Sequence, residues 1–169
     1  MSGKVALIMG SNSDLPKLQK CIDTLKSLKI DAEIRVMSAH RTPDIVRSYV
    51  SSAAEHGIEV IIAAAGGAAH LAGAVAANTL LPVIGIPIEG GAFKGLDSLL
   101  STVQMPGGIP VATVGVGSGG ATNAALLAAQ IMAVKDPELL ERLKADRADR
   151  REKVIAADQE VQESPQFSF

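Results

Sequence analysis

The chain has 169 residues, a length that fits one domain or one domain with an appendage. Apolar residues make up 47% of the composition, which excludes a disordered protein, and Cys21 is the one cysteine, which excludes a disulfide-stabilised scaffold. The balance of 16 basic against 18 acidic residues and the aromatic content of 2% exclude the charge and the stacking side chains of a nucleic-acid-binding protein.

The charged residues are unevenly distributed along the chain. Only Glu89, Lys94 and Asp97 are charged between residues 60 and 134. A membrane span in this region is disfavoured, because glycines, prolines and polar residues divide it into short pieces. We expect these elements to be buried instead, partly by other copies of the chain in a homo-oligomer. The apolar run at 4–9 is too short for a signal peptide, so we expect a cytoplasmic protein without a membrane partner.

The first part of the chain alternates short apolar runs with segments of helical periodicity. Apolar side chains recur every three or four positions from Leu15 to Leu28, which indicates an amphipathic helix. Thr42 and Pro43 predict the start of another helix, with a capping hydroxyl and a proline in the first turn, and Gly57 predicts its end. In chain order we expect a strand at 4–9, a helix from 15, a strand at 32–37, a helix over 42–57 and a strand at 58–65.

The second part continues the alternation with smaller side chains. Asp136 and Pro137 predict the cap of a last, highly charged helix. In chain order we expect a helix to about 78, a strand at 82–88, a helix over 97–104, a strand at 110–116, a helix over 120–134 and the final helix. These elements predict one α/β catalytic domain over 1–134, a charged helix over 135–163 that packs on this domain or on a neighbouring subunit, and a polar tail over 164–169.

Five alternations of strand and helix are typical of an α/β domain with a parallel sheet. We expect a doubly wound, flavodoxin-like sheet of five strands in the order 2-1-3-4-5, in three α/β/α layers, with the extra C-terminal helix. Ligands of such sheets bind beyond the carboxyl ends of the strands, where the strand order reverses. This point lies between the first and third strands, next to the loops at 10–14, 38–42 and 66–70.

The first of these loops has the features of an anion site. It follows a strand, precedes a helix and contains Ser11, Ser13 and Asp14. The free N–H groups at a helix start and the two hydroxyls can bind a phosphate, and the carboxylate can accept hydrogen bonds from ribose hydroxyls. Helix capping by Ser13 or Asp14 explains the same residues, so this loop alone does not distinguish an anion site from a helix cap.

The second loop places His40 and Arg41 side by side at a strand end. A guanidinium binds oxyanions through two parallel hydrogen bonds, which favours a phosphate contact for Arg41, although a structural ion pair is an alternative. His40 can transfer a proton near neutral pH or can simply bond to the loop backbone. In the third loop Gly66 and Gly67 allow a ligand to approach the backbone, and His70 opens the next helix.

Two histidines near one anion site indicate proton-transfer chemistry on a phosphorylated small molecule. His56 lies at a predicted helix end, where the helix dipole explains it, and Cys21 lies on an apolar helix face and is expected in the core. Two histidines without clustered cysteines or carboxylates do not make a metal site, so no metal is expected. The residues do not by themselves define the reaction.

At these loops the sequence resembles the N5-carboxyaminoimidazole ribonucleotide mutase family of purine biosynthesis. The resemblance extends from about Val5 to Met132. The matching segments are 9–14, 38–44, 65–71, 81–85, 95–101, 103–106, 110–113 and 123–125.

The resemblance implies an isomerase that converts N5-carboxyaminoimidazole ribonucleotide to 4-carboxyaminoimidazole ribonucleotide by decarboxylation and recarboxylation at ring carbon 4. It implies that no cofactor or metal is used, and that the chain assembles as an octamer. It implies Ser11, Ser13 and Arg41 as phosphate ligands, Asp14 as ribose ligand, His40 as general acid and base, and Ser38, Gly67, Ala69, His70 and Leu71 at the base and carboxylate end.

Two alternatives remain open. A direct aminoimidazole ribonucleotide carboxylase shares the fold, but such enzymes usually carry Lys-Gly-Pro after the loop histidine, where this chain has Arg41-Thr42-Pro43. A non-catalytic nucleotide-binding module needs no histidine, and would bind the ligand without turnover.

Overall fold

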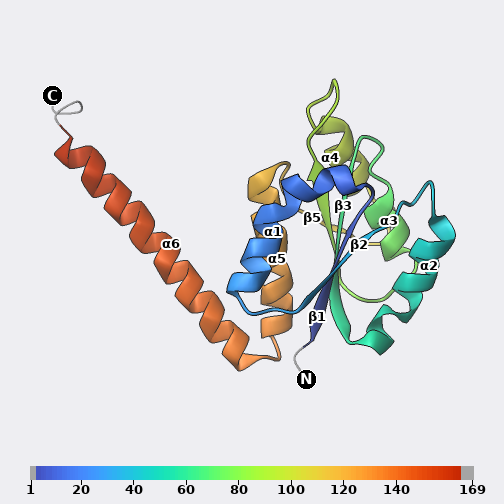
Figure 1. Cartoon of the computed structure of the whole chain (residues 1–169), viewed down its shortest axis with the longest axis horizontal. Coiled ribbons are helices and arrows are strands. Elements are labelled where there is room, and N and C mark those ends of the chain that lie inside the picture. Colours follow the sequence, from blue (N-terminus) through green and yellow to red (C-terminus); the bar gives the residue numbers. More distant parts are fainter. Residues whose placement is uncertain (1–2, 165–169) are drawn as a thin grey trace.

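The apolar runs of the sequence form a parallel sheet with the strand order β2-β1-β3-β4-β5 (Figure 1). This arrangement is that of a computed structural model, which describes residues 3–164. The predicted strand order and the reversal point between β1 and β3 are confirmed. The strands are β1 (Lys4–Met9), β2 (Ala32–Val36), β3 (Ile58–Gly66), β4 (Val83–Ile88) and β5 (Ala112–Thr113).

Helices cover both faces of the sheet, as the three-layer prediction requires (Figure 1). The helical segments are η1 (Asn12–Asp14), α1 (Leu15–Ser27), α2 (Pro43–Ser52), η2 (Ala53–His56), α3 (Leu71–Ala76), α4 (Leu96–Val103), α5 (Ser118–Ala133) and α6 (Pro137–Glu163). Alternate residues of β1 face opposite sides of the sheet: Val5 and Leu7 pack with α1 and α5, whereas Ala6 and Ile8 pack with α2 and α3.

The core between the sheet and α1 also contains Cys21, which is 0% exposed. Burial raises the pKa of its thiol to about 12, so the reactive thiolate is not formed near neutral pH. The prediction that Cys21 is a core residue is confirmed. Within residues 3–164, none of the helices is both long and apolar enough to cross a membrane.

The fifth strand is much shorter than predicted: it covers two residues, Ala112 and Thr113, instead of the range 110–116. It is an edge strand that pairs with Ile84 and Gly85 of β4. Beyond it the chain must turn tightly, because the carbonyl of Gly115 contacts Gly120, where an added Cβ would overlap it. The helix that follows, α5, begins at Ser118, two residues before the predicted start.

Other boundaries also differ from the predictions. The expected loop at 10–14 contains the 3-10 turn η1, and α3 ends at Ala76 instead of near residue 78. The helix expected to reach Gly57 changes to the 3-10 turn η2 after Ser52, and Gly57 follows it with a φ of 80°. Thr42 is at the N-cap position of α2, but the predicted capping hydrogen bond of its side chain is wrong. The Thr42 hydroxyl instead accepts a hydrogen bond from the Ser38 N–H (2.9 Å).

The last helix, α6, contacts the domain near its start and then extends away from it (Figure 1). The Asp136 carboxylate caps it by accepting a hydrogen bond from the Leu139 N–H (3.0 Å), as predicted. Leu139 is 1% exposed, and the Arg142 Nε donates to the Leu28 carbonyl (2.8 Å). Of the predicted tail at 164–169, residues 165–169 lie outside the described residues.

Candidate active site

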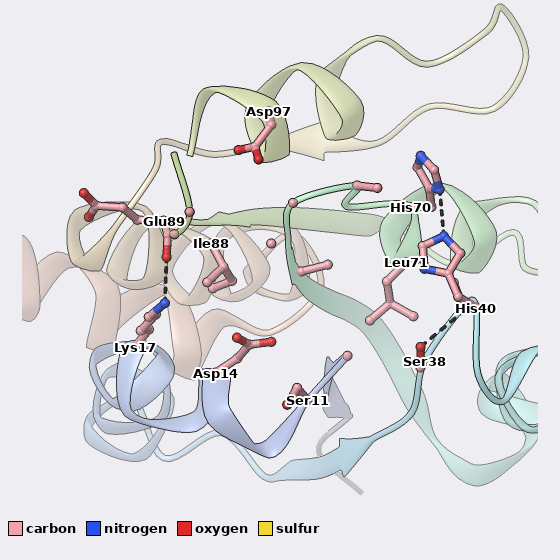
Figure 2. Close-up of a pocket in the computed structure, with 18 of the residues that line it drawn as sticks. Ser11, Asp14, Lys17, Ser38, His40, His70, Leu71, Ile88, Glu89 and Asp97 are labelled. Atoms are coloured by element: carbon pink, nitrogen blue, oxygen red, sulfur yellow. Dashed lines mark hydrogen bonds between the residues drawn. The ribbon is translucent and has the colours of Figure 1, made fainter. Parts of the chain in front are cut away.

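The three predicted loops meet above the point where the strand order reverses, and they enclose a cavity of about 500 Å³ (Figure 2). The loop after β4 and the start of α4 complete it. The cavity is lined by Gly10, Ser11, Asp14, Lys17, Ser38, Ala39, His40, Arg41, Ala65, Gly66, Gly67, Ala68, His70, Leu71, Ile88, Glu89, Gly90, Gly91 and Asp97.

One wall of the cavity combines a helix start with a guanidinium. Ser11 caps η1, and its Oγ accepts hydrogen bonds from the N–H (3.3 Å) and the hydroxyl (2.8 Å) of Ser13. The Arg41 Nη2 donates to the Gly10 carbonyl (2.7 Å), which ties the second loop to the first. The guanidinium has further N–H donors, so this wall can also bind an anion.

The second loop is held by Ser38. Its Oγ accepts hydrogen bonds from the N–H groups of His40 (3.3 Å) and Arg41 (3.2 Å). Thr42 bonds back to the Ser38 backbone through its hydroxyl (2.9 Å). These bonds fix the backbone from which the imidazole and the guanidinium extend.

The two histidines are hydrogen-bonded to each other. His40 Nε2 lies 2.8 Å from His70 Nδ1, and the ring planes are inclined by 75° (Figure 2). Only one proton can lie between these two nitrogens, so the tautomer of one ring determines that of the other. The third histidine, His56, lies elsewhere and bonds to the Ser52 carbonyl (2.9 Å) at the end of η2.

Asp14 is half-buried at the edge of the cavity. Burial raises the pKa of its carboxyl above the ordinary value, and the charge of Lys17 and a hydrogen bond with the Ser11 backbone partly oppose this. The ionised carboxylate is therefore held at some cost in the absence of a ligand. Within residues 3–164, no group of three or more histidine, cysteine or carboxylate side chains is placed to hold a metal ion.

A model of the family described as AIR carboxylase matches residues 4–153. The chain belongs to this family. The match continues beyond residue 134 into α6, past the predicted end of the catalytic domain.

The chain is similar to the N5-carboxyaminoimidazole ribonucleotide mutase of Pyrococcus abyssi, with 58% identity over 86% of this chain and 83% of that one. It is 51% identical to the mutase of Escherichia coli K12 over 90% of each chain. The crystal structure of Treponema denticola PurE superposes with a TM-score of 0.84 at 32% identity, over 94% of this chain and 98% of that one. The resemblance to the mutase family is confirmed, and the chain is an isomerase-type enzyme of purine biosynthesis.

The structure brings most of the residues that the family resemblance indicated to one cavity. Two of them, Ser13 and Ala69, do not line it. The Ser13 hydroxyl is engaged by Ser11. Ala69 is 2% exposed, and its N–H donates to the Ser101 Oγ (3.0 Å). Those that line the cavity are Ser11, Asp14, Ser38, His40, Arg41, Gly67, His70 and Leu71.

Sequence reasoning missed three charged residues of the cavity, Lys17, Glu89 and Asp97. Glu89 and Asp97 had a signal, because they are two of only three charged residues in the region from 60 to 134. Charge retained in an otherwise apolar region is often functional. Lys17 had no such signal, since it is one of three lysines in α1, with Lys20 and Lys26.

Proposed function

We propose that the chain interconverts N5-carboxyaminoimidazole ribonucleotide and 4-carboxyaminoimidazole ribonucleotide in this cavity, with His40 transferring the proton. The observation that carries the proposal is the position of His40. Its imidazole borders the cavity beside the phosphate-binding features of Arg41 and the η1 turn. The mutase relatives, at 51–58% identity over most of the chain, support the reaction itself.

The phosphate of the ribonucleotide binds at the wall formed by Ser11, Ser13 and Arg41 in this proposal. The N–H groups at the start of η1 and α1 and the guanidinium favour a dianion there. Asp14 is one residue further along the same turn and accepts hydrogen bonds from the ribose hydroxyls. Although Ser13 does not line the cavity, its hydroxyl can exchange its bond to Ser11 for one to a phosphate oxygen.

In this proposal the imidazole ring of the substrate lies on the opposite side of the cavity, among Ser38, Gly67, His70 and Leu71. Gly67 has a φ of +62° and no side chain, so a planar ring can approach the backbone. Leu71 lines the cavity and offers an apolar surface to carbon dioxide, which carries no charge. Ala69 holds this loop in place through its hydrogen bond to Ser101.

The proposed reaction is balanced in atoms and protons. The bond between the exocyclic nitrogen and the carboxylate carbon breaks, the nitrogen takes a proton from the protonated imidazole of His40, and carbon dioxide is released within the cavity. Carbon 4 of the ring then bonds to the carbon dioxide, and His40 removes the proton that carbon 4 loses. A positioned acid–base group of this kind accelerates a reaction by roughly 10²- to 10⁴-fold.

A substrate assay tests the proposal against carboxylation of aminoimidazole ribonucleotide, the activity for which the matched family model is named. Purified protein is incubated with N5-carboxyaminoimidazole ribonucleotide without bicarbonate. We expect 4-carboxyaminoimidazole ribonucleotide to form. Product formation that requires aminoimidazole ribonucleotide and added carbon dioxide would contradict the proposal, and binding without turnover would indicate a non-catalytic module.

We also propose that the chain forms a homo-oligomer, with an octamer as the expected state, in the cytoplasm. Large apolar side chains are exposed on one helix, α4, where Leu96, Leu100 and Val103 are about half exposed, and Val134 is 88% exposed at the end of α5. Covering these side chains in an interface is favourable. Analytical ultracentrifugation at micromolar concentration is expected to give a species near eight chains, whereas a stable monomer would contradict this proposal.

A further inference from the structure

Lys17 joins two walls of the cavity that are far apart in the sequence. It lies in the first turn of α1, and its Nζ donates a hydrogen bond to the Glu89 carbonyl (2.6 Å), 72 residues away (Figure 2). The bond is made to the backbone, so it acts on the path of the chain after β4. Both residues line the cavity.

The segment that Lys17 contacts is the loop over residues 89–95, between β4 and α4. The two ends of this loop are fixed by Ser98, whose buried hydroxyl donates to the carbonyls of Ile88 and Gly95 (2.9 Å each). Between these ends the loop is exposed and contains Gly90 and Gly91, which form part of the cavity wall. Glycine gives such a segment many accessible conformations, so an additional anchor matters.

Among the hydrogen bonds of residues 3–164, the bond from Lys17 is the one that connects this loop to an element other than β4 or α4. Lys17 also follows Asp14 by three residues, on the same side of the α1 start, and its charge favours the ionised Asp14 carboxylate. The lysine therefore lies between the ribose-binding carboxylate of the proposed function and the loop opposite.

We infer that Lys17 is a positioning residue, which holds loop 89–95 against the start of α1 and thereby sets the affinity of the cavity for the ribonucleotide. The inference rests on the proposed function for the identity of the ligand. According to this inference, Gly90 and Gly91 close the cavity beside the ribose only while the Lys17 ammonium group is hydrogen-bonded to the Glu89 carbonyl. Loss of the bond leaves the chemistry at His40 intact and weakens nucleotide binding.

Three variants test this role. Lys17→Met removes the ammonium group and keeps a side chain of similar reach, Lys17→Arg retains an N–H donor, and Lys20→Met removes a lysine of the same helix that does not line this cavity. Hydrogen exchange of the amides of residues 90–95 is measured without ligand, and the Kd for 4-carboxyaminoimidazole ribonucleotide is measured by calorimetry. The midpoint of thermal unfolding checks that each variant is folded.

We expect Lys17→Met to speed amide exchange in the loop and to raise the Kd by roughly 3- to 10-fold each. This is the range for one ordinary hydrogen bond, because water screens the charge of the exposed ammonium group. Lys17→Arg should recover most of both losses, Lys20→Met should change neither, and kcat should stay within about twofold in all three. Unchanged amide exchange of the loop in Lys17→Met would overturn the inference. A higher Kd with unchanged exchange would show that Lys17 binds the nucleotide directly instead of positioning the loop. A wild-type chain that binds no nucleotide would contradict the proposed function, while the exchange comparison would still decide whether Lys17 anchors the loop.

Discussion

The charged residues of this molecule are used in two different ways, in the cavity and in α6. In the cavity, Arg41 and Lys17 donate to backbone carbonyls 31 and 72 residues away. In α6, Arg150 pairs with Asp146 (2.6 Å), and Lys153 pairs with Asp149 (2.6 Å), each four residues away on the same helix.

The charged residues of the cavity connect loops that are distant in the sequence, whereas the charged pairs of α6 lie on the solvent-exposed surface of one helix. The pairs along α6 are exposed and local, and such pairs contribute little to stability. The cavity cations connect separate loops, and the half-buried Asp14 carboxylate near Lys17 has its pKa raised by burial. We therefore expect substitutions in the cavity to change binding or turnover, and substitutions of these exposed pairs of α6 to change little.

The largest effect is expected for His40→Asn, which keeps the approximate size of the side chain and cannot transfer the proton. Turnover of N5-carboxyaminoimidazole ribonucleotide should fall by roughly 10²- to 10⁴-fold, while the nucleotide still binds. His56→Asn is the matched control, because His56 bonds to a backbone carbonyl outside the cavity. Steady-state kinetics with a parallel binding titration measures both quantities. Near-normal turnover of His40→Asn would contradict the role given to His40.

The next effect is expected for Arg41→Ala. Loss of one charge-assisted phosphate contact should weaken nucleotide binding by about 1.5–3 kcal/mol. Because Arg41 also bonds to the Gly10 carbonyl, the midpoint of thermal unfolding is measured together with the Kd. A lower unfolding midpoint with unchanged affinity would show that the guanidinium only ties the two loops together. Arg41→Lys keeps the charge but loses the paired donors, so it should recover part of the affinity.

A smaller effect, with a pH dependence of known sign, is expected for Asp14→Asn. Burial raises the pKa of Asp14 in the folded state above its ordinary value of 3.8, so ionised Asp14 destabilises the fold. This cost is absent well below pH 3.8, where the group is protonated in both states. It grows as the pH rises from 3.8 to the raised pKa, and it is complete above that pKa. The asparagine variant should therefore unfold at a higher temperature than wild type at pH 7, and the difference should vanish toward pH 3.8. A lower midpoint for the variant at pH 7 would contradict this account.

The smallest effect is expected for Arg150→Ala on α6. Its partner, Asp146, lies on the same exposed helix, so the free energy of unfolding should change by no more than about 0.5 kcal/mol, with turnover unchanged. Urea denaturation and the substrate assay measure these values. A large loss of activity would indicate that this part of α6 contributes to a site, for example that of a neighbouring subunit, and would weaken the contrast between the two regions.

The sequence predicted the fold well where side-chain patterns are local. The run at 4–9 forms β1 over the predicted residues, and the periodic segment from Leu15 forms α1. The prediction of β5 over 110–116 failed, because apolar character does not show where an edge strand loses its partner. The Thr42 hydroxyl does not form the expected helix cap, because it is hydrogen-bonded to the backbone N–H of Ser38, four residues earlier.

For the site, the sequence by itself determined the chemical groups and the three loops that carry them. The strand order predicted from the βα alternation brings those loops together, and the resemblance to the mutase family indicated the reaction. Only the tertiary structure decided how the groups meet: that His40 and His70 share one proton, that Arg41 ties loop to loop, and that Lys17 reaches the Glu89 carbonyl. The physical reason is that a hydrogen bond depends on tenths of an ångström and on angle, and these follow from packing across the sheet rather than from residue order.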